Sequence, residues 1–173
     1  MELPSLVREV LVRMGVHLLT LQCTEHVIRL CLQIVLPKEP INTLEDLHSL
    51  EQREGKKTIG YFLFALRQRA SIAPEFDEQL TKFLAARNAF AHDLSSVPGW
   101  DMQTEEGCRK CIELLEQWED QATEVQNVFA GLLRGWELQR DKPTQLAGAE
   151  ALFSAIERDF VPKAHGLFTA KDA

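Results

Sequence analysis

A sustained heptad repeat over residues 108–136 restricts the fold of this chain more than any other feature of the sequence. Two apolar positions recur every seven residues for four heptads. The first series is Cys108, Leu115, Ala122, Phe129 and Trp136, and the second is Cys111, Trp118, Val125 and Leu132. This spacing places both series on one stripe of a long α-helix, and such a stripe must pack against other helices. The repeat therefore predicts an all-α fold.

The remaining pattern is also helical, and alternation typical of strands is scarce. A second long helix is predicted from Ser5 to Leu36, with Met14, Leu21, Ile28 and Val35 in heptad spacing flanked by Leu18, Cys31 and Leu32. A loop and a short turn are predicted next, with a cap and first turn at 42–47. Shorter helices are predicted from Thr58 to about Arg69, from the segment 71–80, with Pro74 near the first turn, to about Leu94, and from Gln145 to Phe160, before a polar tail at 163–173. Prolines at 37 and 40 end the first helix, since proline cannot continue one.

We therefore expect one domain over residues 1–173, an up-and-down bundle of about five helices with two long ones. The bundle proper would span about 5–140. The length and the ordinary composition, 45% hydrophobic and 26% charged, suit a globular chain that buries its own core. The sequence shows no signal-peptide pattern at its start and no apolar run approaching the roughly 20 residues that cross a bilayer. We therefore predict a cytoplasmic protein without a membrane partner.

The net charge of −7 argues against a protein whose whole surface binds nucleic acid. The charge is uneven, however, because residues 53–87 carry seven Lys and Arg against four acids. A basic patch that contacts RNA is one interpretation, with Lys56, Lys57, Arg67, Arg69 and Lys82 as its candidates. Solvated helix faces are the other interpretation of the same charges.

The four cysteines are predicted to be reduced thiols. Cys108 and Cys111 resemble half of a zinc or redox motif, but both occupy the apolar stripe of the long helix, and no second pair follows. Core packing is the favoured interpretation, with a metal or redox role as the alternative. The histidines at 17, 26, 48 and 165 show no ligand spacing, so we expect neither a metal site nor an organic cofactor.

One arginine interrupts the apolar stripe of the helix predicted at 74–94. Phe76, Leu80, Leu84, Ala91 and Leu94 share one face at about 100° per residue, and Arg87 falls within it. Arginine is seldom buried unless it is paired. This face is therefore predicted either to carry a paired arginine or to open onto a ligand or a second chain.

Arg87 also belongs to the segment "RNAFAH", with Asn88 and His92 four residues apart on one flank of the helix. A guanidinium can bind a phosphate through two hydrogen bonds, and an imidazole can exchange a proton near pH 7. Together they suit cleavage of an RNA phosphodiester: His92 would withdraw the 2′-hydroxyl proton and Arg87 would neutralise the developing charge. A capped helix end with a paired arginine is the structural alternative.

An arginine, a polar residue and a histidine at this spacing on an amphipathic helix resemble the signature of the HEPN superfamily (higher eukaryotes and prokaryotes nucleotide-binding). The resemblance is close over "LAARNAFAHDL" and rests on helix pattern over about 5–140. It implies a homodimer in which two such helices form a composite cleft, with Arg87, Asn88 and His92 in the catalytic roles.

The resemblance further implies a metal-independent ribonuclease of a toxin–antitoxin, phage-defence or stress module, with RNA or a nucleotide as ligand and an antitoxin protein as a possible partner. One toxin group carries a tyrosine two residues after the histidine, which its antitoxin modifies. Here that position is Leu94, so this route of regulation is not expected. The superfamily also contains members without demonstrated catalysis. The alternative is therefore a non-catalytic module that binds a nucleotide or a partner protein.

Overall fold

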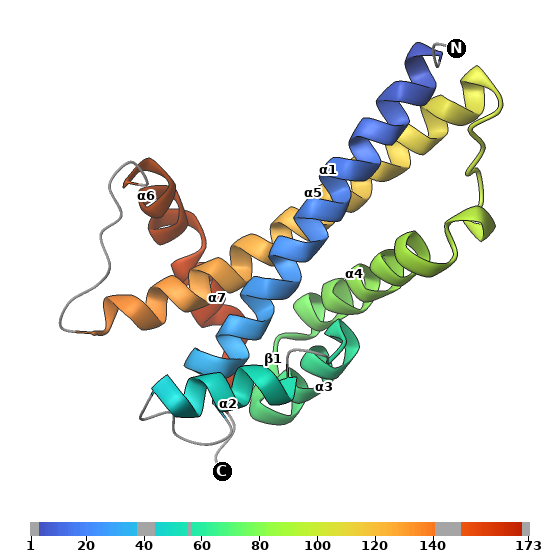
Figure 1. The fold of residues 1–173 in the computed structure, drawn as a ribbon. Helices are drawn as coiled ribbons and strands as arrows, with labels where there is room; N and C mark the ends of the chain where they lie inside the picture. The colour runs from blue at the N-terminus through green and yellow to red at the C-terminus, as the bar shows by residue number, and fades with distance from the viewer. Residues whose placement is uncertain (1–3, 38–43, 55–56, 141–149, 171–173) are drawn as a thin grey trace. The chain divides into compact units, whose positions relative to one another are not determined.

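The structure is a computed structural model that describes residues 4–37, 44–54, 57–140 and 150–170, and its fold is all-α, as predicted (Figure 1). Its helices are α1 (Ser5–Leu30), α2 (Leu44–Glu54), α3 (Ile59–Arg69), α4 (Pro74–His92), α5 (Glu105–Leu138), α6 (Glu150–Asp159) and α7 (Val161–Leu167). A π-helical turn, η1 (Cys31–Val35), continues α1, and a 3-10 turn, η2 (Leu94–Ser96), follows α4.

The two longest helices are those that the heptad repeats predict. α5 contains 34 residues, and α1 with its π-helical turn ends one residue before the predicted boundary at Leu36. α5 begins where Thr104 caps it: the Thr104 hydroxyl oxygen accepts a hydrogen bond from the Gly107 amide at 3.0 Å. Glu105 and Glu106 follow in the first turn, where carboxylates interact favourably with the helix dipole.

The boundaries of the shorter helices also follow local signals. Thr58 caps α3 by accepting a hydrogen bond from the Tyr61 amide at 3.4 Å. α2 has 11 residues where the sequence predicts only a short turn. α4 begins at Pro74, which the prediction placed near the first turn, and ends at His92 rather than Leu94. Asp93 leaves helical geometry with φ −145° and ψ 35°, and its carbonyl then accepts the Ser96 amide of η2.

The C-terminal region differs from its prediction. The helix predicted at 145–160 is observed as α6, whereas residues 145–149 lie outside the described residues. In place of a polar tail at 163–173, the chain forms α7 and the strand β2 (Phe168–Ala170), which pairs antiparallel with β1 (Ala70–Ile72). Strands of three residues are too short to leave a readable alternation in the sequence, so this pairing was not anticipated.

The chain divides into two compact units, each built from two segments. Unit 1 comprises Met1–Thr24 and Gln79–Val125, and unit 2 comprises Glu25–Glu78 and Gln126–Ala173. Aromatic rings of Phe76, Phe129 and Phe168 pack together in unit 2, with centroids 5.5–6.1 Å apart. Unit 1 contains the motif at Arg87–His92 and is described in more detail.

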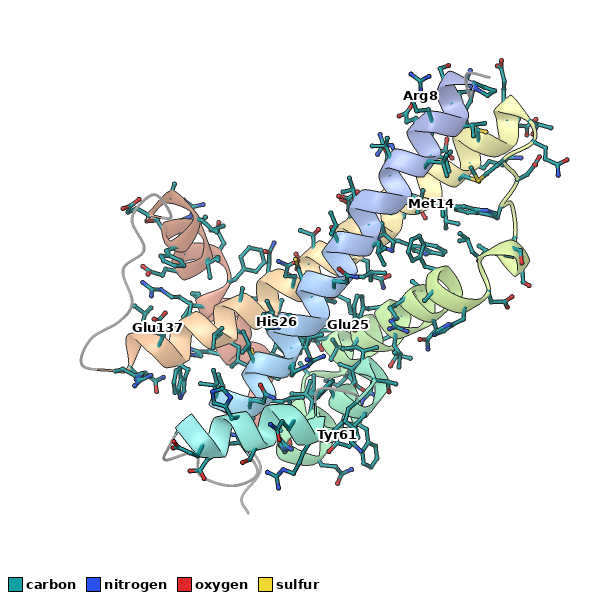
Figure 2. The ribbon with its side chains drawn as sticks, viewed as in Figure 1. Arg8, Met14, Glu25, His26, Tyr61 and Glu137 are labelled. Atoms are coloured by element: carbon teal, nitrogen blue, oxygen red, sulfur yellow. The ribbon has the colours of Figure 1, made fainter. Side chains whose placement is uncertain are left out.

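The core of unit 1 joins three helices. Val10 of α1 is buried with Cys108, Cys111 and Leu115 of α5, and Phe90 of α4 packs against this cluster. Met14 lies on α1 against the same cluster (Figure 2). Further along α1, the Thr24 hydroxyl donates a hydrogen bond to the Ala122 carbonyl at 3.4 Å. The same offset of 98 residues relates Val10 to Cys108 and Thr24 to Ala122, so α1 and α5 run parallel and in register within unit 1.

α1 itself departs from the predicted pattern. Leu21 is buried as expected, but Leu18, predicted to flank the buried repeat, is 47% exposed, and His17 is buried instead. The stripe that faces α5 includes Val10, His17 and Thr24. Because His17 and Thr24 are polar, a pattern of apolar residues does not identify this stripe. Other apolar side chains point outward, and these are Leu11, Val12, Val16, Leu18 and Leu19.

By length and hydropathy alone, the helical segment Ser5–Val35 could cross a membrane. The search of the sequence for a continuous apolar run did not identify this segment. Core helices of soluble proteins and N-terminal signal sequences satisfy the same criterion. The cytoplasmic location therefore stays a prediction.

Candidate functional site

The three residues of the predicted motif lie together at the C-terminal end of α4. The Arg87 guanidinium nitrogen Nη1 lies 3.3 Å from the Asn88 side-chain oxygen, to which it donates, and 3.4 Å from Nε2 of His92. Asn88 and His92 are exposed, and Arg87 is half-buried. One guanidinium group therefore meets an amide and an imidazole at a surface that a ligand can reach.

The position of His92 follows from the end of the helix. His92 is the last residue of α4, and the chain leaves helical geometry at the next residue. A guanidinium can only donate hydrogen bonds, so Nε2 of His92 accepts from Arg87 in the tautomer that carries the ring proton on Nδ1. In that tautomer Nε2 carries a lone pair, which is what a general base requires.

Arg87 lies on the apolar stripe without being enclosed by it. Phe76 and Leu80 are buried at the start of α4 and Leu84 is half-buried. Ala91, predicted on the buried stripe, is exposed. The buried face of the last turns is carried by Phe83 and the half-buried Phe90 instead, and the arginine's aliphatic stem can follow that face while its charged end reaches the surface.

The described candidate RNA-contacting residues are divided between the two units. Lys82 is exposed on α4 in unit 1. Arg67 pairs with Asp77 at 2.7 Å, and the Nη1 nitrogen of Arg69 donates to the carbonyls of Leu32 and Leu36 at 2.9 Å each, all within unit 2. These two arginines have structural partners, and Lys82 is the candidate that shares a unit with the motif.

The other two candidate RNA-contacting residues are Lys57, which lies just before α3, and Lys56. The Lys57 ammonium lies 5.0 Å from the ring centroid of Tyr61, an exposed residue labelled in Figure 2. Lys56 lies outside the described residues. Their part in RNA binding stays a prediction.

The two cysteines of α5 are buried against backbone carbonyls. Cys108 lies 3.6 Å from the Met102 carbonyl oxygen and Cys111 lies 3.6 Å from that of Asp101, and burial raises the pKa of the Cys111 thiol. All four cysteines are free thiols. Within the described part of the chain, no group of three or more His, Cys, Asp or Glu side chains could hold a metal ion. The surroundings of Cys111 favour packing over thiolate chemistry.

His17 lies in the core of unit 1, a placement that its sequence context did not predict. It is 1% exposed, and neither ring nitrogen has a hydrogen-bond partner. Burial lowers its pKa from 6.5 to about 4, so the ring is neutral near pH 7. Its ring centroid lies 4.8 Å from that of Phe90 and 6.0 Å from that of Trp118. The seven-residue spacing of Val10, His17, Thr24 and Cys31 was the signal that could have revealed it.

Comparison with protein-family models, with curated proteins and with solved structures finds no match to this chain. The case for function therefore rests on the residues of the site.

Proposed function

We propose that this protein is a metal-independent endoribonuclease of the HEPN type, with Arg87, Asn88 and His92 as its catalytic residues. The observation that carries the proposal is the convergence of these side chains, with Nη1 of Arg87 within 3.4 Å of both partners. In cleavage of RNA by its own 2′-hydroxyl, an imidazole can accept the hydroxyl proton and a cation can stabilise charge on the phosphate, while an amide can orient either group.

In the proposed reaction, Nε2 of His92 accepts the proton of the 2′-hydroxyl while the 2′-oxygen attacks the adjacent phosphorus. The bond from phosphorus to the 5′-oxygen breaks, and that oxygen takes a proton from water. The products are a 2′,3′-cyclic phosphate and a 5′-hydroxyl. Arg87 turns its donors from His92 to the phosphate oxygens and stabilises their developing charge, while Asn88 orients His92 or a phosphate oxygen.

The proposed enzyme is a homodimer with the two α4 helices near the two-fold axis. Two features of unit 1 support association of copies. Arg87 lies half-buried on an otherwise apolar stripe, and α1 exposes a run of large aliphatic side chains, of which Val12 and Leu19 are about 60% exposed. Contiguous exposed apolar surface of this kind commonly marks an interaction site.

The biological setting we propose is a cytoplasmic toxin–antitoxin, phage-defence or stress module. Because Leu94 occupies the position of the modified tyrosine in one toxin group, an antitoxin partner would act by another route.

One observation favours a second candidate function. The chain carries a net charge of −7. On α5, Glu113 and Asp120 are exposed acids, and Glu116 between them pairs with Arg13 at 2.9 Å. Such a surface repels a long polyanion. It suits a non-catalytic module that holds a nucleotide or a partner protein at the same residues.

Cleavage of a labelled single-stranded RNA by purified protein separates the two candidates. Wild type should cleave with EDTA present and leave a cyclic phosphate, and His92→Ala and Arg87→Ala should each lose at least about 10²-fold in rate. His26→Ala and Arg109→Ala alter exposed residues outside the motif and serve as matched controls that should retain activity. Equal cleavage by wild type and His92→Ala, or loss of cleavage on chelation, would rule out the mechanism. Nucleotide binding without cleavage would support the second candidate.

A further inference from the structure

An open groove of about 740 Å³ lies beside the motif in unit 1. One wall comes from α4, one from α5, and the segment after α4 contributes Ser96, Val97 and Pro98. The residues that define its chemistry are Lys82, Ala89, Gln117, Trp118 and Gln121. Its volume falls within the ~300–1,000 Å³ typical of small-ligand sites.

The groove offers a flat apolar surface next to polar amides. Trp118 is half-buried and lines the groove. Its ring centroid lies 6.0 Å from that of His17 and 6.4 Å from that of Phe90, so neighbouring rings hold the indole in place. Gln117 and Gln121 stand on either side of it along α5. Each carboxamide supplies both hydrogen-bond donors and an acceptor, which matches the mixed edge of a nucleobase.

The charge of the lining indicates which part of a nucleotide fits. The lining holds one lysine, Lys82, and one aspartate, Asp93, so its formal charges cancel. The Asp93 carboxylate already accepts a hydrogen bond from the Ser96 hydroxyl at 2.6 Å. A neutral, planar, hydrogen-bonding group is therefore favoured over a phosphate.

The groove borders the motif through α4. Ala85 and Ala89 line the groove, and each precedes a motif residue, Asn88 or His92, by three positions. Residues at this spacing are neighbours on a helix surface, with Cβ atoms about 5–6 Å apart. The alanines leave space beside Asn88 and His92 that larger side chains would fill.

We propose that this groove is a base-binding subsite, in which a nucleobase of single-stranded RNA stacks on Trp118 and hydrogen-bonds to Gln117 and Gln121 while the adjoining phosphate lies at Arg87 and His92. The inference rests on the proposed function. It adds that binding depends on an unpaired base as well as on the phosphate, because the groove has no excess positive charge to hold the backbone alone.

Binding is measured on His92→Ala protein, which removes cleavage from the experiment. Each of the four ribonucleosides should shift the NMR signals of the Trp118 indole N–H and of the Gln117 and Gln121 side-chain amides, whereas ribose 5-phosphate should not. Ala89→Leu in the same background fills the groove and should weaken binding of an RNA hexamer about tenfold, the loss expected from one stacked base. Ala151→Leu makes the same change at an exposed residue of α6, outside the groove and the motif, and should leave affinity unchanged.

The outcomes separate this inference from the proposed function. Equal hexamer affinity in the Ala89→Leu and Ala151→Leu proteins overturns the subsite, even if wild-type protein cleaves RNA. Groove signals that ignore nucleosides and move only with protein concentration also overturn it, since they indicate an interface between copies. Nucleoside-dependent shifts in a protein whose wild type cleaves no RNA leave the subsite standing and remove the ribonuclease proposal.

Discussion

The imidazole of His17 meets the ring of Phe90 edge-on, with centroids 4.8 Å apart and an interplanar angle of 89°. This contact joins α1 to α4 on the inner side of the helix that carries Arg87 and His92. Because both ring nitrogens of His17 are buried without a hydrogen-bond partner, a proton added to the ring would place an uncompensated charge among aromatic groups.

The first prediction concerns pH. The unfolded chain binds a proton at His17 below its ordinary pKa of 6.5, whereas the folded chain does so only near 4. Between these values the unfolded state binds more protons, so stability is complete above about pH 6.5 and falls as the pH drops toward 4. Allowing for solvent screening, we expect a loss of about 1–3 kcal/mol.

Urea unfolding from pH 7.5 to 4.5 measures this loss. His17→Phe should flatten the curve across the window, and His26→Gln, at an exposed histidine, should not. Parallel curves for wild type and His17→Phe would contradict the prediction.

The second prediction is that Cys108 and Cys111 are structural. Cys111→Ala should lower the unfolding free energy by about 1–2 kcal/mol, because it leaves a space beside Val10 and Leu115. Cys23→Ser, at an exposed cysteine, should change it by less than about 0.5 kcal/mol. Chemical unfolding gives both values. Stoichiometric zinc in purified wild type, lost in Cys111→Ser, would show instead that the thiols bind metal.

The third prediction compares two helical glycines. A Cβ atom on Gly107 would lie 2.7 Å from Cβ of Asp101 and would also collide with the Asp101 carbonyl oxygen, whereas one on Gly15 would meet nothing within 4 Å. Gly107→Ala should destabilise the protein by about 1–3 kcal/mol. Gly15→Ala should stabilise it by about 0.5–1 kcal/mol, through the lower backbone entropy of the unfolded chain. Thermal unfolding gives the Tm of each variant relative to wild type. Shifts in Tm of the same sign for the two variants would contradict the prediction.

The fourth prediction is a dimer in solution. Light scattering at tens of micromolar should give twice the mass of the 173-residue chain. Leu19→Glu places a charge on the exposed apolar run of α1, and it should weaken association without reducing helical content if that run lies in the interface. Asp120→Asn, at an exposed residue of α5, is a conservative surface control. A monomeric wild type would exclude both the dimer and the composite cleft that the resemblance implies.

Helix positions were the part of the fold most accessible from sequence. α5 and most of α1 could be predicted because an apolar residue every third or fourth position fixes a helix without reference to its partner. The capping threonine at 58 and the proline at 74 likewise act within one turn. Within the motif, the spacing of Arg87, Asn88 and His92 on one helix already placed them within reach of one another.

The sequence alone determined the two long helices, α3, α4 and the residues of the motif, because these depend on neighbours only a few positions away. Only the tertiary structure decided which residues make contacts between one helix or strand and another. It buried the polar His17 in the stripe facing α5 while leaving Leu18 outside, since the in-register packing of α1 against α5 selects a face irrespective of its polarity. It paired β1 with β2 across nearly a hundred residues and engaged Arg69 with the end of α1. These contacts join segments that are far apart in the sequence, and the periodicity of each segment carries no information about its partner. The groove beside Trp118 likewise exists only because α4 and α5 meet there.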